Sequence, residues 1–130
     1  MDLLVNLDVD DLDKAVRFYS AALDLKVGRR FGFSGVEMLG SSSTIYLLVK
    51  SSATQVSPTT TQQRNYQRHW TPILVDEIEP AVERAVIAGA RLEQPIVTNN
   101  RGKLALMADP FGHGFCFVQF LGRGYDEVAE

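Results

Sequence analysis

The chain has 130 residues, which are enough for one buried core and too few for two domains of ordinary size. It is 45% hydrophobic and 22% charged, a composition that excludes the disordered and low-complexity classes. Its formal net charge is -3 and it has no long block of lysine or arginine, so we expect no nucleic-acid partner.

The first residues and the single cysteine bear on cellular location. The segment from Met1 to Asn6 is acidic where a signal peptide is positive, and no apolar run approaches the about 18 residues that span a membrane. We therefore expect a cytoplasmic protein without a membrane partner. Cys116 is the only cysteine, so it cannot form an internal disulfide. It lies in an apolar run, where cysteine usually packs as a small hydrophobic residue.

The first half of the chain is predicted to form one helix among short strands. An apolar segment at residues 3–9 precedes apolar residues that recur at helical spacing from Leu12 to about Ala22. Turn-forming residues then separate stretches that favour the β conformation. These stretches are Lys26 to Phe31, Gly35 to Leu39 and Thr44 to Lys50.

The second half of the chain repeats this order. A short apolar segment from Trp70 to Val75 leads into a helical pattern that begins near Ile78. The pattern ends at Gly89, a residue suited to a left-handed C-terminal cap. The predicted strands that follow are Arg91 to Val97, Lys103 to Ala108 and Gly114 to Leu121.

The two halves also agree residue by residue at the start of each helix. Residues 9–16 and 75–82 match in type at seven of eight places. Each segment offers an aspartate as helix N-cap, Asp10 in the first and Asp76 in the second. We therefore predict one domain over residues 1–130. Its parts are module one at about 1–50, a linker at about 51–68, module two at about 69–121 and a C-terminal tail at 122–130.

Three motifs carry a resemblance to a known family. They are Val9-Asp10-Asp11-Leu12 with Phe18-Tyr19, Val75-Asp76-Glu77-Ile78, and above all Asp109-Pro110-Phe111-Gly112-His113. In this order and spacing the chain resembles the glyoxalase/bleomycin-resistance/dioxygenase (vicinal oxygen chelate) superfamily. The resemblance implies an α+β fold in which two βαβββ modules form curved half-sheets around a cavity. It also implies a small organic ligand and a homodimer, since many relatives complete their cavities across the interface.

The same resemblance addresses metal binding. Metal-dependent relatives take four ligands, usually histidine, glutamine or glutamate, from the first and last strands of both modules. Alignment on the helix starts places these positions at Leu4, near Tyr46, near Trp70 and at Cys116. None of the four is an ordinary oxygen or imidazole ligand for a divalent ion. We therefore expect no metal and no other cofactor.

Six residues are candidates for contacting a ligand, because pockets of this kind combine apolar walls with a few polar groups. They are Tyr46, Trp70, Cys116, Glu37, Phe33 and Arg101. Tyr46 and Trp70 would supply aromatic walls, with packing in the core as the equal alternative. For Arg101 the favoured alternative is a solvated position in a turn.

The two histidines are weaker candidates. His69 is offset by one residue from Trp70, so in a strand its side chain would point to the opposite face. His113 precedes the last predicted strand, where a solvated turn residue is more typical than a catalytic base.

We interpret the chain as a binding protein without metal, resembling the bleomycin-resistance branch and holding an apolar or aromatic ligand. One alternative is a metal-dependent glyoxalase-type lyase or isomerase, or a ring-cleaving dioxygenase, in which a metal polarises substrate oxygens. Another is an isomerase or lyase that uses side chains alone, with Glu37, His69 or His113 as acid and base.

Overall fold

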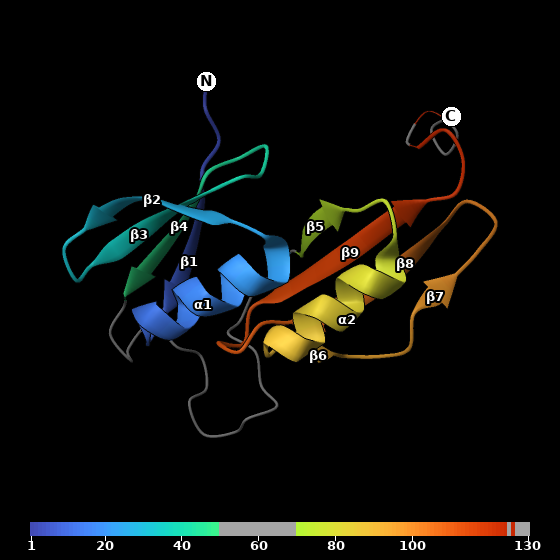
Figure 1. Ribbon diagram of the computed structural model, residues 1–130. Helices are drawn as coiled ribbons and strands as arrows, with labels where there is room; N and C mark the ends of the chain where they lie inside the picture. Colours follow the sequence, from blue (N-terminus) through green and yellow to red (C-terminus); the bar gives the residue numbers. More distant parts are fainter. Residues whose placement is uncertain (50–69, 125, 127–130) are drawn as a thin grey trace.

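The computed structural model describes residues 1–49, 70–124 and 126 (Figure 1). Module one contains one helix and four strands. They are β1 (Val5–Val9), α1 (Leu12–Leu23), β2 (Lys26–Phe31), β3 (Gly35–Leu39) and β4 (Ile45–Val49). The predicted βαβββ order is confirmed, and β2 and β3 have the predicted bounds. The predicted linker and His69 lie outside the described residues, as does most of the tail.

Module two repeats the order with one irregularity. Its elements are β5 (Thr71–Leu74), α2 (Ile78–Ala88), β6 (Arg91–Leu92), β7 (Val97–Thr98), β8 (Gly102–Ala108) and β9 (Gly114–Phe120). The prediction of one continuous strand from Arg91 to Val97 is wrong, because two short strands stand there instead. Pro95 lies between them and has no N–H to donate to a β ladder, so it interrupts the pairing with β8.

Each module forms its own sheet. The strand order is β1-β4-β3-β2 in one sheet and β5-β9-β8-β6 in the other, with β7 also paired to β8. In both sheets the first strand of the module runs parallel to the last one, β1 with β4 and β5 with β9. The fold class is therefore the predicted one, an α+β fold built from two βαβββ modules.

The N-cap of helix α1 lies one residue later than predicted. Asp11, not Asp10, is the N-cap, and its carboxylate accepts the N–H of Lys14 at 3.0 Å. The cap belongs at Asp11 because a capping side chain reaches a backbone N–H two or three residues further on. At the other end Asp24 adopts the left-handed conformation, with φ of 55°.

The start of α2 is capped from another strand. Glu77 stands at the N-cap position in place of the predicted Asp76, and its side chain makes no capping hydrogen bond. Gln119 of β9 supplies the acceptor, because its Oε1 lies 2.8 Å from the N of Ile78. This bond ties the helix to its own sheet. Gly89 ends α2 as predicted.

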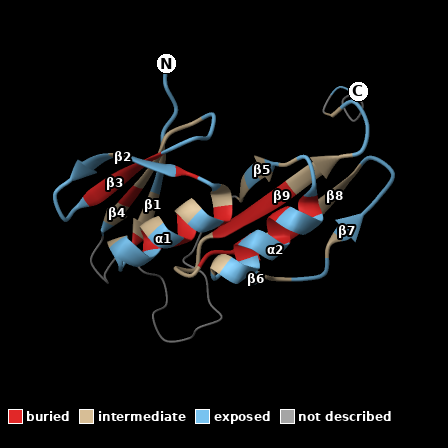
Figure 2. Ribbon diagram, viewed as in Figure 1, coloured by how far each residue is buried: buried red, intermediate tan, exposed pale blue. Residues whose placement is uncertain are grey.

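The helices divide the sheets into two kinds of face. Figure 1 shows α1 and α2 side by side on one face of the paired sheets, and the two helices pack against each other. Figure 2 shows buried segments in β3 and β9, and the core residues of these strands include Val36, Met38, Phe115 and Phe117. Alternate residues point to the opposite side, which no described helix covers. We call the two uncovered surfaces the open faces of module one and module two.

A buried polar joint connects the modules on the helix side. The Tyr19 hydroxyl of α1 donates to Asp109 Oδ2 at 2.5 Å, and both side chains are buried. Asp109 Oδ1 accepts the backbone N–H groups of Phe111 and His113, each at 2.8 Å. The ring of His113 then reaches back to module one, with Nε2 at 2.6 Å from the carbonyl oxygen of Asp8.

Burial dominates the electrostatics of this joint. It raises the pKa of Asp109, although the charge of His113 and hydrogen bonds from Tyr19 and the turn act in the opposite direction. Burial, followed by the Asp109 charge, also raises the pKa of Tyr19 well above its usual value, so the phenol remains a donor.

Within the part of the chain that the structure describes, neither helix has the length and apolarity needed to cross a membrane.

We expect Tyr19→Phe to lower the free energy of unfolding by roughly 1 to 3 kcal/mol, because it leaves a buried carboxylate oxygen without its donor. Urea denaturation at neutral pH measures this loss. The loss should shrink as the pH falls, since the variant raises the pKa of Asp109 further and protonation then relieves the penalty.

The matched control for this substitution is Tyr46→Phe on the open face. Its hydroxyl shares Glu37 with Arg29, so the carboxylate keeps a donor when the hydroxyl is removed. Equal losses of stability in the two variants would contradict the joint's role.

Candidate functional site

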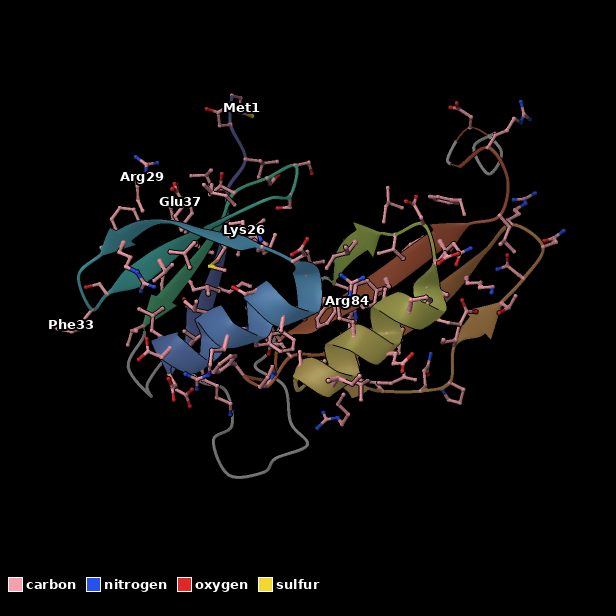
Figure 3. The ribbon with its side chains drawn as sticks, in the orientation of Figure 1. Met1, Lys26, Arg29, Phe33, Glu37 and Arg84 are labelled. Carbon is pink, nitrogen blue, oxygen red and sulfur yellow. The ribbon has the colours of Figure 1, made fainter. Side chains whose placement is uncertain are left out.

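A three-residue polar cluster lies on the open face of module one. Glu37 of β3 is 5% exposed and accepts hydrogen bonds from Arg29 of β2 and Tyr46 of β4. Arg29 contributes its backbone N–H at 3.0 Å, its Nε at 3.2 Å and a guanidinium N–H at 2.8 Å. The Tyr46 hydroxyl donates to the second carboxylate oxygen at 3.1 Å. Figure 3 shows Arg29 and Glu37 next to each other at the outer edge of the sheet.

The strand register explains why these side chains meet. Glu37 and Tyr46 are direct partners across β3 and β4, so their side chains point to the same face. Opposite them, β2 is bulged between Val27 and Arg30. Gly28 in this bulge leaves space for the carboxylate, because a Cβ there would stand 2.5 Å from Glu37 Oε1.

The Glu37 carboxyl group of this cluster stays ionised near neutral pH. The side-chain hydrogen bonds from Arg29, helped by its backbone N–H, lower the pKa of Glu37 to about 2. Glu37 is therefore ionised at neutral pH and is a poor proton acceptor for general base catalysis. The Arg29 side chain is 73% exposed, so its outer edge stays accessible to a ligand. Phe31 adds an aromatic wall, since its ring centroid lies 6.1 Å from that of Tyr46.

The open face of module two is apolar. Cys116 of β9 pairs with Pro72 on one side and with Leu106 on the other, which gives the three side chains a common face. Cys116 is 7% exposed, and burial raises the pKa of its thiol, so it stays protonated and unreactive at neutral pH. The Trp70 ring lies against Gly114, where a Cβ would stand 2.7 Å from the ring.

Of the four positions that the resemblance aligns with metal ligands, the strand register places Tyr46 and Cys116 on the open faces. Tyr46 is paired with Asn6 of β1 in module one, and Cys116 with Pro72 in module two. Their chemistry does not fit a divalent ion: Leu4 has no donor atom, the Tyr46 phenol already donates to Glu37, and the Cys116 thiol is held protonated. Among the described residues, no three His, Cys, Asp or Glu side chains come together in an arrangement that could hold a metal.

The remaining candidates lie elsewhere. Phe33 is 98% exposed in the turn between β2 and β3, where Figure 3 shows it at the tip of the sheet. Arg101 is exposed in the turn before β8, where its N–H bonds to the Asn99 side chain. His113 belongs to the joint between the modules. Glu37 and His113 thus have different partners, and the two do not form an acid–base pair.

A cavity of about 550 Å³ lies between the modules, next to both helices. The last turn of α1, the inner side of α2, strands β1 and β5 and the loop at residues 40–43 surround it. None of the six candidate residues is among the described residues that line it. Sequence reasoning missed two arginines of functional interest, Arg84 in this cavity and Arg29 beside Glu37. Strand alternation alone could not place Arg29, because the bulge between Val27 and Arg30 shifts the register of β2.

The chain matches known proteins over most of its length. A family model described as the glyoxalase-like domain matches residues 4–118. A glyoxalase/bleomycin resistance protein/dioxygenase family enzyme from Burkholderia phytofirmans superposes with a TM-score of 0.75 at 20% identity, over 93% of this chain and 100% of that one.

Two further solved structures share the fold. The fosfomycin resistance protein FosX from Listeria monocytogenes, complexed with Mn(II), has a TM-score of 0.73 at 16% identity, covering 97% of this chain and 93% of that one. Lactoylglutathione lyase from Agrobacterium tumefaciens has a TM-score of 0.64 at 15% identity, with 92% of each chain covered. No protein of curated function matches the sequence.

We expect Arg29→Met to raise the pKa of Glu37 from about 2 toward its ordinary value of about 4.3, because the variant removes the largest cause of the shift. Carbon-detected NMR titration of the carboxyl group measures both values. The folded pKa lies below the unfolded one, so this stabilisation is present above the ordinary pKa and is lost as the pH falls toward 2.

Arg30→Met is the matched control, because Arg30 is the neighbouring exposed arginine and its partner across the strands is Val36 instead of Glu37. If the pKa of Glu37 were the same in Arg29→Met as in the wild-type protein, the ion pair would not be the cause of the lowered pKa.

Proposed function

We propose a function from one premise: the chain belongs to the glyoxalase-like domain family. In this proposal the protein binds a small apolar or aromatic organic molecule without a metal, as the bleomycin-resistance branch of the vicinal oxygen chelate superfamily does. The ligand lies against the open faces. Tyr46 and Phe31 contribute walls from module one, and Trp70 and Cys116 contribute walls from module two.

One observation carries this proposal. The resemblance aligns the metal-ligand positions with Leu4, the neighbourhood of Tyr46 and Trp70, and Cys116, and none of these is an ordinary ligand for a divalent ion. The strand register directs Tyr46 and Cys116 to the open faces. In this proposal an apolar and aromatic surface beside the Arg29–Glu37 ion pair takes the place of a metal site. Such a surface suits an aromatic body with one polar group that Arg29 or Tyr46 can orient.

The proposal includes a homodimer. The two modules lie side by side, so the open faces of one chain do not enclose a ligand by themselves (Figure 1). Both faces expose large apolar side chains, which soluble proteins usually cover with a partner. These are Phe31, Leu39, Leu74 and Val97, with exposed fractions of 44%, 41%, 57% and 47%. In the dimer, module one of each subunit meets module two of the other around the ligand.

The metal-dependent chemistry of FosX or lactoylglutathione lyase is the contrasting function. Elemental mass spectrometry of untagged protein, challenged with manganese, iron, zinc and nickel, separates the two. We expect far less than one retained ion per subunit. Stoichiometric binding of any of these ions would overturn the metal-free proposal and favour an enzyme.

Ligand binding has its own test. We expect neutral aromatic compounds such as naphthol or biphenyl derivatives to raise the melting temperature, and Trp70→Leu to weaken their affinity by roughly tenfold. Ile87→Ala is the control, because Ile87 is an exposed apolar residue on α2, away from the open faces. Equal effects of the two substitutions would contradict the placement of the ligand.

We expect Leu39→Glu to dissociate the dimer, because it introduces a charge on the open face of module one. Ile87→Glu adds the same charge on the outer side of α2, where Ile87 is 80% exposed, and should leave the dimer intact. Sedimentation velocity across a concentration series measures both. A monomeric wild-type chain, or a dimer that survives Leu39→Glu, would exclude this interface.

A further inference from the structure

The cavity between the modules has chemistry that the proposed function does not use. Its walls come from β1 and β5 and from the facing sides of α1 and α2, and they include Pro72 and Leu74, which the strand register places on the open face of module two. Two alanines, Ala22 of α1 and Ala81 of α2, line it where larger side chains would fill the space. Its volume of about 550 Å³ is within the usual range of sites for small organic ligands.

The lining of the cavity is apolar with one cation. Arg84 of α2 is the only lysine or arginine among the described residues that line it, and no aspartate or glutamate lies among them. Most of the other lining residues are aliphatic or aromatic, and a loop of three serines, Ser41 to Ser43, adds hydroxyl groups at one side. His113 also touches the cavity, but its Nε2 is already bonded to Asp8.

Arg84 has no competing partner within the part of the chain that the structure describes. Neither a hydrogen bond nor an ion pair joins its guanidinium to a described residue, whereas Arg29 is bound to Glu37 and Lys103 to Glu79. Figure 3 shows Arg84 extending from α2 toward the seam between the modules. Arg84 is exposed and also borders a neighbouring hollow with Asp76 and Glu77, but it forms an ion pair with neither of them. Its guanidinium can therefore bind a carboxylate or sulfonate through paired N–H groups.

We propose that this cavity is a second binding site, for a small monoanion with an apolar body whose charged group is held by Arg84. One cation matches one negative charge, and the apolar walls exclude strongly hydrated dianions such as free phosphate. The serine loop at residues 41–43 orients the same group by hydrogen bonding. Pro72 and Leu74 border both this cavity and the open face of module two, but Arg84 belongs to α2 and to neither open face, so substitutions of Arg84 test this site separately from the proposed function.

A pair of fluorescent probes tests the charge requirement. Anilinonaphthalenesulfonate is an apolar monoanion, and phenylnaphthylamine is its neutral counterpart without the sulfonate. We expect the wild-type protein to bind the sulfonate more tightly than the neutral probe. Arg84→Met should weaken sulfonate binding by roughly tenfold and leave the neutral probe unchanged.

Control substitutions show where on the protein the fluorescent probe binds. Arg17→Met removes an exposed arginine on α1 that does not line the cavity, and it should change neither affinity. Ser42→Trp narrows the cavity at its exposed loop and should weaken both probes. Amide NMR shifts induced by the sulfonate should concentrate at residues 41–43 and 71. Far-ultraviolet circular dichroism confirms that each variant is folded.

The opposite result is equally clear. If sulfonate binding is lost in Arg29→Met but retained in Arg84→Met, the anion binds on the open face and the cavity proposal is wrong. Equal affinity of the wild-type protein for both probes would also overturn it. Neither result bears on the metal content or the dimer, so failure here is distinguishable from failure of the proposed function.

Discussion

The hydrogen bond between Tyr19 and Asp109 is the constraint on which the arrangement of the two modules depends. It joins the first helix of one module to the last turn of the other, and both side chains are buried. A buried carboxylate must keep its donors, so the turn at residues 109–113 and helix α1 cannot separate without a large cost. The packing of α1 against α2 and the cavity between the modules lie next to this joint, and Tyr19 itself lines the cavity.

Strand alternation gives each module two chemically different sides. On the helix side, the residues of β3, β8 and β9 are almost entirely apolar and form one core with both helices. On the open side the modules differ, because module one presents a fixed ion pair with aromatic neighbours and module two presents apolar groups. In the homodimer that we propose, these two unlike surfaces face each other, and the cavity between the modules is the separate site proposed for an anion.

The sequence predicted the repeat, both helices and most strands, because apolar periodicity and turn residues are local signals. It placed both N-caps one residue early, since either of two adjacent acidic residues satisfies the pattern. It named Glu37 and Tyr46 as separate candidates, and only the strand register shows that the two share a face. It missed Arg29, which lies beside them next to a bulge. The sequence could not identify Arg84 as a site residue, because the cavity beside it forms only when the two modules pack together.

Trp70 has a consequence for observing this protein. It is the only tryptophan of the chain, and its ring rests on Gly114 at the open face of module two. Its neighbour Thr71 lines the cavity on the other side of the same strand. The molecule therefore carries one native optical reporter, free of overlapping indole signals, next to both surfaces where a ligand can arrive. Its emission wavelength and quenching distinguish events at these surfaces without any added label.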